Sequence, residues 1–174
     1  MGLCNIECVE KIARYLDVCP GKLEVSNNKH IVLGPESKDS LPIQGFSTIV
    51  QALLRRSKYS DLLGNDKEAQ ALTQQWLEYI TVCINYADLP ANAKRVFHEL
   101  NTVLQDVTYI TGTEKTLADI ALYYVLHSLM KQLSHQEKAQ YIHLSRWFDN
   151  VQQEKKLRNE LDVVSFELVY LFRS

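Results

Sequence analysis

Residues 109–120 read YITGTEKTLADI, and this string contains the strongest local signal in the chain. Its last part, Thr116-Leu117-Ala118-Asp119, has the form of a capping box with aspartate as the acidic member. The Thr116 hydroxyl can accept the backbone N–H of Asp119, while the Asp119 carboxylate accepts the N–H of Thr116. The carboxylate also lies at the positive end of the helix dipole. The string therefore predicts a helix that begins at Leu117.

Apolar residues recur at helical spacing on both sides of this box, from about residue 66 to residue 161. Pro90 separates two of the periodic segments, because proline cannot continue a helix. The pattern predicts helices over residues 69–87, 91–104, 117–133, 136–141 and 145–161. We therefore expect an all-helical domain over residues 57–174.

The first part of the chain, residues 1–56, predicts a smaller lobe of mixed structure. Apolar spacing and turn residues indicate a helix, a two-stranded hairpin with an Asn-rich turn, and a second helix, at residues 5–16, 22–33 and 46–56. A lobe of this size cannot form a stable core alone. We expect it to pack against the helical domain.

The bulk properties exclude several classes of partner. The formal net charge is −2 and the basic residues are dispersed, so we expect no direct binding of nucleic acid. The first ten residues lack the positive region of a secretory signal, and no apolar stretch approaches the ~20 residues of a membrane span. We expect no membrane partner.

The four cysteines are expected to be free thiols in a chain that can build its own core. Cys4 and Cys8 are one helical turn apart, which would suit half of a zinc site, but the histidines supply no paired spacing for the other half. We expect no metal and no cofactor. His127 is expected to be a hydrogen-bonded structural residue.

The string at residues 109–120 resembles the buried capping motif of the C-terminal helical domain of glutathione-transferase-like proteins. In that motif a glycine at the place of Gly112 shapes the loop before the helix. An apolar residue stands where this chain has Lys115, which we expect to contribute only its aliphatic stem. The strings QWLEY at 75–79 and SRWF at 145–148 are similar to those of translation-associated members of the family. The resemblance implies a mostly α fold, with a reduced thioredoxin-like lobe at residues 1–56 and the helical domain at 57–174.

The resemblance also implies that the transferase chemistry is missing. The chain opens with a helix, leaving no room for the first strand and its catalytic hydroxyl. Ile31 stands at the position of the cis-proline, and Gly45-Phe46 replaces the acidic-Ser pair that holds the γ-glutamyl group. Phe46 would obstruct the γ-glutamyl pocket. We expect a non-catalytic adaptor, with a residual glutathione-dependent transferase as the alternative.

Glutathione-transferase-like domains pair through two surfaces, and the resemblance places both on this chain. The candidates for the first face come from the helix after the strands and from the first long helix: Thr48, Gln51, Ala52, Arg55, Thr73 and Trp76. The second face centres on Arg146, where guanidinium can form bidentate bonds with a carboxylate. Trp76 could instead belong to the core. Trp147 and Phe148, and not Arg146, are expected to hold the second face on the core.

By this resemblance to auxiliary subunits of the multi-aminoacyl-tRNA synthetase complex, the first face takes the matching domain of methionyl-tRNA synthetase. The second takes that of glutamyl-prolyl-tRNA synthetase. A cytoplasmic location is implied, and a nuclear one stays open. The apolar segment at residues 163–172 is expected either to fold back over the N-terminal lobe or to bind a partner.

Overall fold

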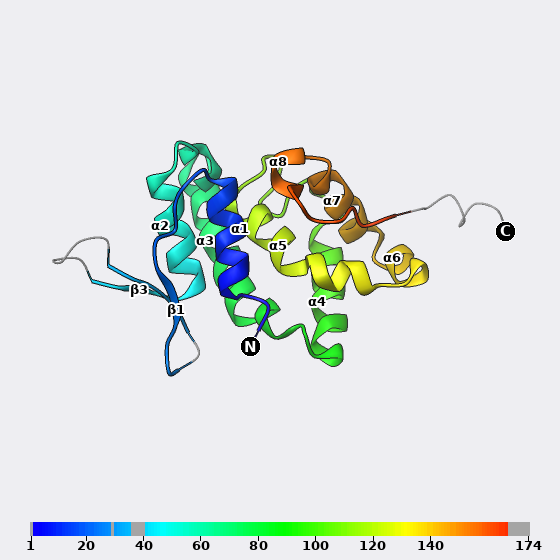
Figure 1. Ribbon diagram of the computed structural model, residues 1–174. Helices are drawn as coiled ribbons and strands as arrows, with labels where there is room; N and C mark the ends of the chain where they lie inside the picture. The colour runs from blue at the N-terminus through cyan, green and yellow to red at the C-terminus, as the bar shows by residue number, and fades with distance from the viewer. Residues whose placement is uncertain (1, 29, 36–40, 167–174) are drawn as a thin grey trace.

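The computed structural model describes residues 2–28, 30–35 and 41–166. Figure 1 shows a mostly helical molecule with a small sheet at one edge, as the resemblance implied. In chain order the elements are α1 (Ile6–Tyr15), β1 (Leu23–Val25), β2 (Ile31–Leu33), β3 (Ile43–Gln44), α2 (Phe46–Arg56), η1 (Ser60–Leu63), α3 (Lys67–Val82), η2 (Ile84–Tyr86), α4 (Pro90–Val103), α5 (Leu117–Gln132), α6 (His135–Gln140), α7 (Ile142–Gln152) and α8 (Lys155–Arg158).

The sheet confirms the expected hairpin and adds a third strand. All pairs are antiparallel in the order β1-β2-β3, with Leu33 opposite Leu23 on one side and opposite Ile43 on the other. The two-residue strand β3 is too short for its sequence to show the alternation by which strands are recognised. α1 and α2 both pack against this sheet and against each other.

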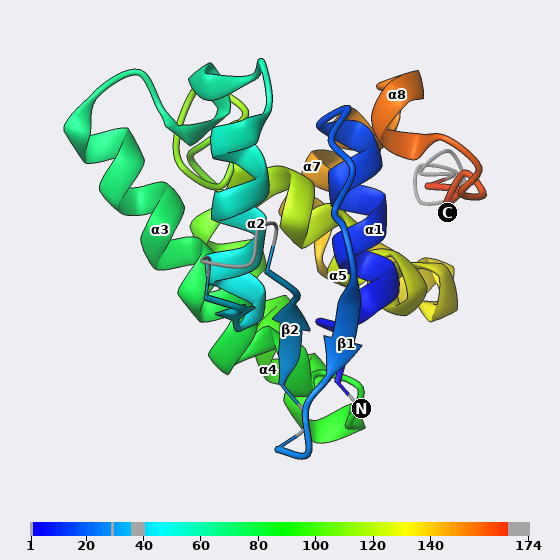
Figure 2. The same cartoon turned by 60° about the vertical axis from the view of Figure 1, so that its left-hand side comes forward.

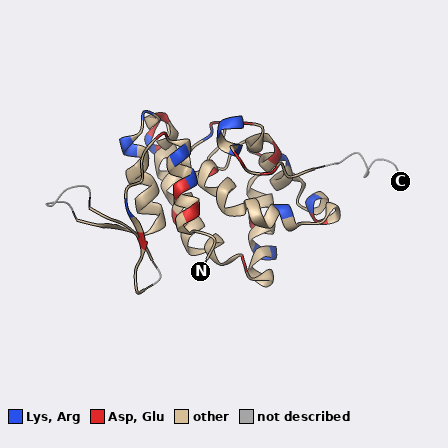
Figure 3. Ribbon diagram, in the orientation of Figure 1, with Lys and Arg blue, Asp and Glu red and all other residues tan. Residues whose placement is uncertain are grey.

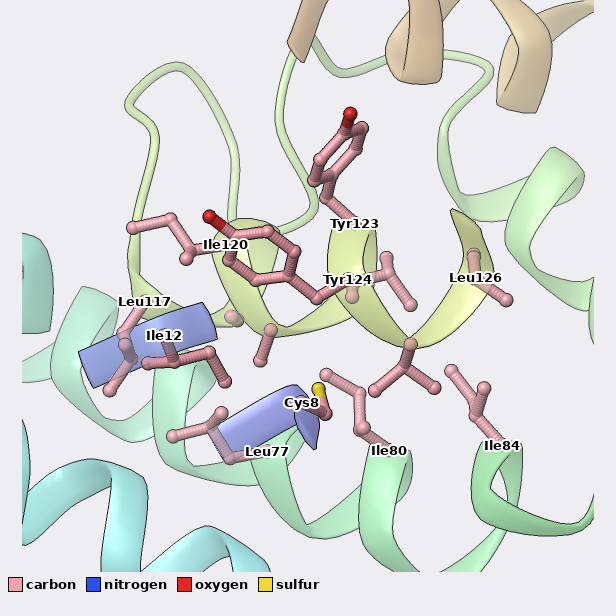
Figure 4. Close-up of a cluster of buried hydrophobic side chains, with 14 of the residues drawn as sticks. Cys8, Ile12, Leu77, Ile80, Ile84, Leu117, Ile120, Tyr123, Tyr124 and Leu126 are labelled. Carbon is pink, nitrogen blue, oxygen red and sulfur yellow. The ribbon is translucent and has the colours of Figure 1, made fainter. Parts of the chain in front are cut away.

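α5 forms the centre of the molecule, and all of its residues from Leu117 to His127 are buried. α1 and α3 pack against it from the side of the small lobe, and α7 packs against it from the other side (Figures 1 and 2). Figure 4 shows side chains of α5 in one cluster with Cys8 and Ile12 of α1 and with Leu77 and Ile80 of α3. The small lobe therefore shares its core with the helical domain, as its size requires. The boundary at residue 56 stays a prediction.

The capping box at the start of α5 is present as predicted. Asp119 is completely buried, and its Oδ2 accepts the backbone N–H of Thr116 at 3.0 Å. Its Oδ1 accepts the backbone N–H of Ile110 at 2.9 Å and the indole N–H of Trp147 at 2.8 Å. Burial raises the pKa of Asp119, and these hydrogen bonds oppose that rise. One carboxylate thus joins α5, α7 and the loop between α4 and α5.

Gly112 shapes that loop as the resemblance implied. Tyr109 and Gly112 exchange two backbone hydrogen bonds of 2.9 Å each, which closes a tight turn. The φ angle of Gly112 is 133°, in a region that residues with a Cβ rarely adopt. The turn brings Ile110 back to the carboxylate of Asp119.

The bounds of two helices differ from the expectation. The helix expected over 69–87 ends at Val82 and is followed by the short η2. The helix expected over 145–161 begins earlier, at Ile142, and ends at Gln152, with only α8 after it. Asn159 then takes a positive φ of 47°, which ends helical structure and redirects the chain.

Residues 161–166 follow as an extended segment, which we call the strap. The strap packs against α5, α6 and α7, where Val164 is buried and the ring of Phe166 lies 5.9 Å from that of Phe148. Residues 163–166 of the expected segment therefore pack on the chain, as one of the two alternatives had it, but on the helical domain and not on the N-terminal lobe. The rest of the expected segment, residues 167–172, lies outside the described residues.

His127 has the structural role that was expected, because its Nε2 lies 2.9 Å from the carbonyl oxygen of Asp162 in the strap. Burial lowers the pKa of His127; Lys11 and Lys131 act in the same direction, while Asp162 opposes them. The neutral imidazole is therefore the form that the folded state favours.

His127 should make the free energy of unfolding depend on pH. A lowered folded pKa means that its contribution is complete above the unfolded value of about 6.5 and is lost as the pH falls through the folded value. Unfolding in urea between pH 7.5 and 5 should show this loss. His127→Gln keeps a donor for the carbonyl of Asp162 but does not titrate. The free energy of unfolding of this variant should therefore fall less between pH 7.5 and 5 than that of the wild-type chain. An equal loss in both proteins would contradict this role.

Candidate interaction surfaces

The positions that the resemblance assigns to the glutathione site of transferases, Ile31 and Phe46, make contacts within the chain. Ile31 lies in the middle strand, where it pairs with Val25 and its carbonyl accepts the N–H of Gly45 at 2.9 Å. Phe46 begins α2 and is 3% exposed. Its side chain is part of the hydrophobic core.

The first face lies on α2 and α3, which pack against each other. Thr48 and Arg55 are exposed, and Gln51 and Ala52 are half-buried. The amide of Gln51 donates to the hydroxyl of Ser47 at 3.1 Å, which holds its side chain along the helix. The four α2 candidates are therefore accessible, and their role in binding stays a prediction.

The two α3 candidates differ in accessibility. Thr73 is completely buried, and its hydroxyl donates to the carbonyl of Ala69 at 2.8 Å. The prediction that Thr73 is a surface contact was therefore wrong. Its hydroxyl can be buried because the hydrogen bond to Ala69 replaces the one that water would make. Trp76 is half-buried and packs edge-on against Tyr79 with a centroid distance of 5.3 Å. Trp76 therefore stays partly accessible, and its role in binding stays a prediction.

The second face has a different construction from the one that we expected. Arg146 is exposed on α7, but its guanidinium donates to the carbonyls of Leu104 and Val107, at 2.5 and 3.0 Å. These carbonyls lie at and just beyond the C-terminus of α4, where cations are favourable. Trp147 and Phe148 are buried as expected. Arg146 therefore shares with them the task of holding α7 in place.

A hollow of about 400 Å³ lies beside this arginine, lined by residues 105–108, Arg146, Trp147 and Asn150. Two exposed apolar residues occur nearby in the fold: Val103 at the end of α4 and Ile142 at the start of α7. Asn101 joins these helix ends by accepting the backbone N–H groups of residues 143 and 144. Sequence reasoning missed Ile142, although it stands one helical turn before Arg146 and so shares its face.

Lys115 stands where the family has an apolar residue, and the structure uses its charge. Its ammonium forms an ion pair with Glu154 and donates to the hydroxyl of Tyr15 at 3.0 Å. The Tyr15 hydroxyl in turn donates to Glu154 at 2.9 Å. The network joins α1 of the small lobe to the segment between α7 and α8. The expectation that only the aliphatic stem contributes was wrong.

Lys115→Met should lower the free energy of unfolding by about 1–2 kcal/mol, because Glu154 loses a partner in a partly buried site. The side chains of Lys115 and Glu154 are 23% and 34% exposed, so the loss should be below that of a fully buried pair. Urea unfolding checks this value. Adding Glu154→Gln removes the unpaired charge and should restore part of the loss. An increase in stability for Lys115→Met alone would contradict the network.

Burial keeps two of the four thiols in their unreactive, protonated form. Burial raises the pKa of Cys4 to about 12 and that of Cys8 well above its usual range, so both thiols are protonated. Among the described residues, no group of three or more His, Cys, Asp and Glu side chains is placed to hold a metal ion.

The surface charges have mixed signs. Figure 3 shows acidic and basic residues together on α1 and distributed over other helices. Lys11 pairs with Glu7 on α1, and Lys156 pairs with Asp17 at 2.8 Å. No helix in the described part of the chain is long and apolar enough to cross a membrane.

Comparison with known proteins finds one matching family and relatives that share one name. A family described as nuclear-export cofactor Arc1p matches residues 69–155. Eukaryotic translation elongation factor 1 epsilon-1 of Cricetulus griseus is 32% identical over 155 residues, which cover 89% of this chain and 89% of that protein. The protein of the same name from Homo sapiens is 37% identical over 124 residues, or 71% of each chain.

Solved structures support the fold. A glutathione S-transferase from Pichia kudriavzevii superposes with a TM-score of 0.70 at 16% identity, covering 88% of this chain and 89% of that one. The glutathione-transferase-like domain of elongation factor 1-gamma from Saccharomyces cerevisiae gives a TM-score of 0.65 at 15% identity, covering 91% and 89%. At these identities the likeness concerns the fold alone.

Proposed function

Because the chain belongs to the family of eukaryotic translation elongation factor 1 epsilon-1, we propose that it is a non-catalytic adaptor in translation. It joins aminoacyl-tRNA synthetases by pairing with their glutathione-transferase-like domains. The observation that carries the proposal is that the positions assigned to the glutathione site make contacts within the chain. The backbone of Ile31 is paired within the sheet, and Phe46 is part of the core. A transferase fold with this construction offers surfaces rather than a substrate pocket.

The position of the two faces supports simultaneous binding of two partners. α2 and α7 lie on opposite sides of α5 (Figure 1). A domain seated on α2 and α3 therefore leaves α4 and α7 accessible. A specific pairing typically buries about 800 Å² on each partner, so two partners that bind together need two separate faces.

We assign the methionyl-tRNA synthetase domain to the first face and the glutamyl-prolyl-tRNA synthetase domain to the second. Mixed surface charge supports protein partners over direct binding of nucleic acid, since no basic surface is needed for the former. The adaptor is expected in the cytoplasm, where synthetases act, and the nucleus is a second location to be examined by imaging of the tagged chain.

Calorimetric titration of the purified chain with each synthetase domain tests the proposal. Saturable binding to both domains is expected. The alternative, a residual transferase, is tested with the same preparation on immobilised glutathione and in a thiol-conjugation assay. We expect no retention and no turnover. Specific elution by free glutathione, together with failure to bind either domain, would replace the adaptor by the transferase.

A further inference from the structure

The strap, residues 161–166, is held by the helical domain in the way that proteins hold a bound peptide. It begins beyond α8 and crosses α7 toward α6 without helix or strand of its own (Figure 1). His127 of α5 contacts the carbonyl of Asp162 at 2.9 Å, and Lys138 of α6 donates to the carbonyl of Ser165 at 2.9 Å. For residues 162–166, each main-chain hydrogen bond that the structure describes involves a side chain of the helical domain.

Gln152 of α7 makes the central contact. Its amide nitrogen donates to the carbonyl of Val164 at 2.8 Å, and its amide oxygen accepts the N–H of the same residue at 3.0 Å. Gln152 is 1% exposed. Gln152 thus bonds to Val164 as a neighbouring β-strand would. Both bonds involve only main-chain atoms of Val164, so any extended segment could form them.

Specificity comes from alternate side chains of the strap. Val164 is 3% exposed, and Phe166 lies on Phe148 with the ammonium of Lys138 5.3 Å from its ring centroid. Asp162 forms an ion pair with Lys131 at the surface, where the side chains are 71% and 57% exposed, so this pair contributes less than the contacts of Val164 and Phe166. The intervening Val163 is 58% exposed and faces away. This period of two is that of an extended peptide with one face on its receptor.

We propose that this groove on α5, α6 and α7 is a peptide-recognition site that binds an extended segment of a partner protein. The segment has an acidic residue, a β-branched residue two positions later and an aromatic residue two positions after that. In the free chain the strap, with Asp162, Val164 and Phe166, occupies the groove. The groove is separate from both faces of the adaptor, because its contacts come from the other side of α7 from Arg146.

Tethering makes the strap a competitor of high effective concentration, so the wild-type chain should bind a free peptide weakly. Weakening the strap should therefore strengthen binding in trans. Val164→Asp does this in the full-length chain by placing a charge in the buried position of the strap. Adding Gln152→Ala to that variant removes the main-chain contact from the groove itself.

The probe is a fluorescent peptide with the sequence of residues 161–166, followed by polarisation. The Val164→Asp chain should bind the peptide at least tenfold more tightly than the wild-type chain. Adding Gln152→Ala to that chain should lower its affinity for the peptide at least tenfold. A peptide with aspartate in place of Val164 should not bind. Near-UV circular dichroism establishes that each chain is folded.

A folded Val164→Asp chain that binds the peptide no better than wild type overturns the proposal, as does equal binding of the aspartate peptide. If the Val164→Asp chain does not fold, the proposal is tested by peptide binding to the wild-type chain. Saturable binding at higher peptide concentration, with faster deuterium exchange in the strap, supports displacement. No saturable binding to the wild-type chain then overturns it. Neither result depends on the synthetase domains.

Discussion

Asp119→Ala is expected to lower the free energy of unfolding by about 3–5 kcal/mol. The variant removes one acceptor from a site with no exposure, leaving the N–H groups of Ile110, Thr116 and Trp147 without a partner. Each buried donor that loses its partner costs about 1–3 kcal/mol, and loss of the cap adds about 1 kcal/mol, before relaxation reduces the sum. Urea unfolding followed by circular dichroism and tryptophan fluorescence measures the loss.

Glu137→Ala is the matched control for this prediction. Glu137 has the same place in a capping box at the start of α6, with Ser134 as the N-cap, but its carboxylate lies at the surface. Water can replace the carboxylate there, so Glu137→Ala should lower the free energy of unfolding far less than Asp119→Ala does. Equal losses would show that the buried network around Asp119 contributes nothing beyond an ordinary cap.

The second large effect is expected at the two faces. Thr48→Glu should weaken binding of the methionyl-tRNA synthetase domain at least about a hundredfold, or about 2.7 kcal/mol. Ile142→Asp should do the same for the glutamyl-prolyl-tRNA synthetase domain, because each change places an unpaired charge in an interface. Each variant should keep its affinity for the other domain. Calorimetric titration measures all four pairs.

These substitutions are matched in their effect on the helices. Thr48 lies in the first turn of α2 and Ile142 begins α7, and an acidic residue in a first turn is favourable. Melting temperatures should therefore hardly move. Arg146→Glu is a less selective test, since it also removes the hydrogen bonds to Leu104 and Val107. A variant that loses both partners while it melts normally would contradict the assignment of two separate faces.

The sequence was sufficient for features that depend on local pattern. The capping box at Thr116 and Asp119 follows from residue type and spacing, whereas the role of Gly112 in the loop and that of Trp147 in holding α7 were implied by the family resemblance. The hairpin and the central helix were also predictable, because periodicity and turn residues are local signals.

Features that depend on contacts between distant residues were not predictable. Lys115 finds Glu154 and Tyr15 only when the loop, α1 and the end of α7 are brought together. The burial of Thr73 depends on how α2 and α5 cover α3. α7 ends at Gln152, and α8 separates it from the strap. The groove that holds the strap is assembled from three helices, so its position could not be predicted from a local pattern.

Reconstitution of the chain with both synthetase domains is the most direct test of the adaptor. Size-exclusion chromatography with light scattering gives the mass of the complex formed by the wild-type chain. One copy of each of the three proteins in a single species is the expected result, and Thr48→Glu and Ile142→Asp should each yield a complex that lacks a different domain. Binding of either domain only when the other is absent would mean that the partners compete for one surface, and the adaptor with two faces would be contradicted.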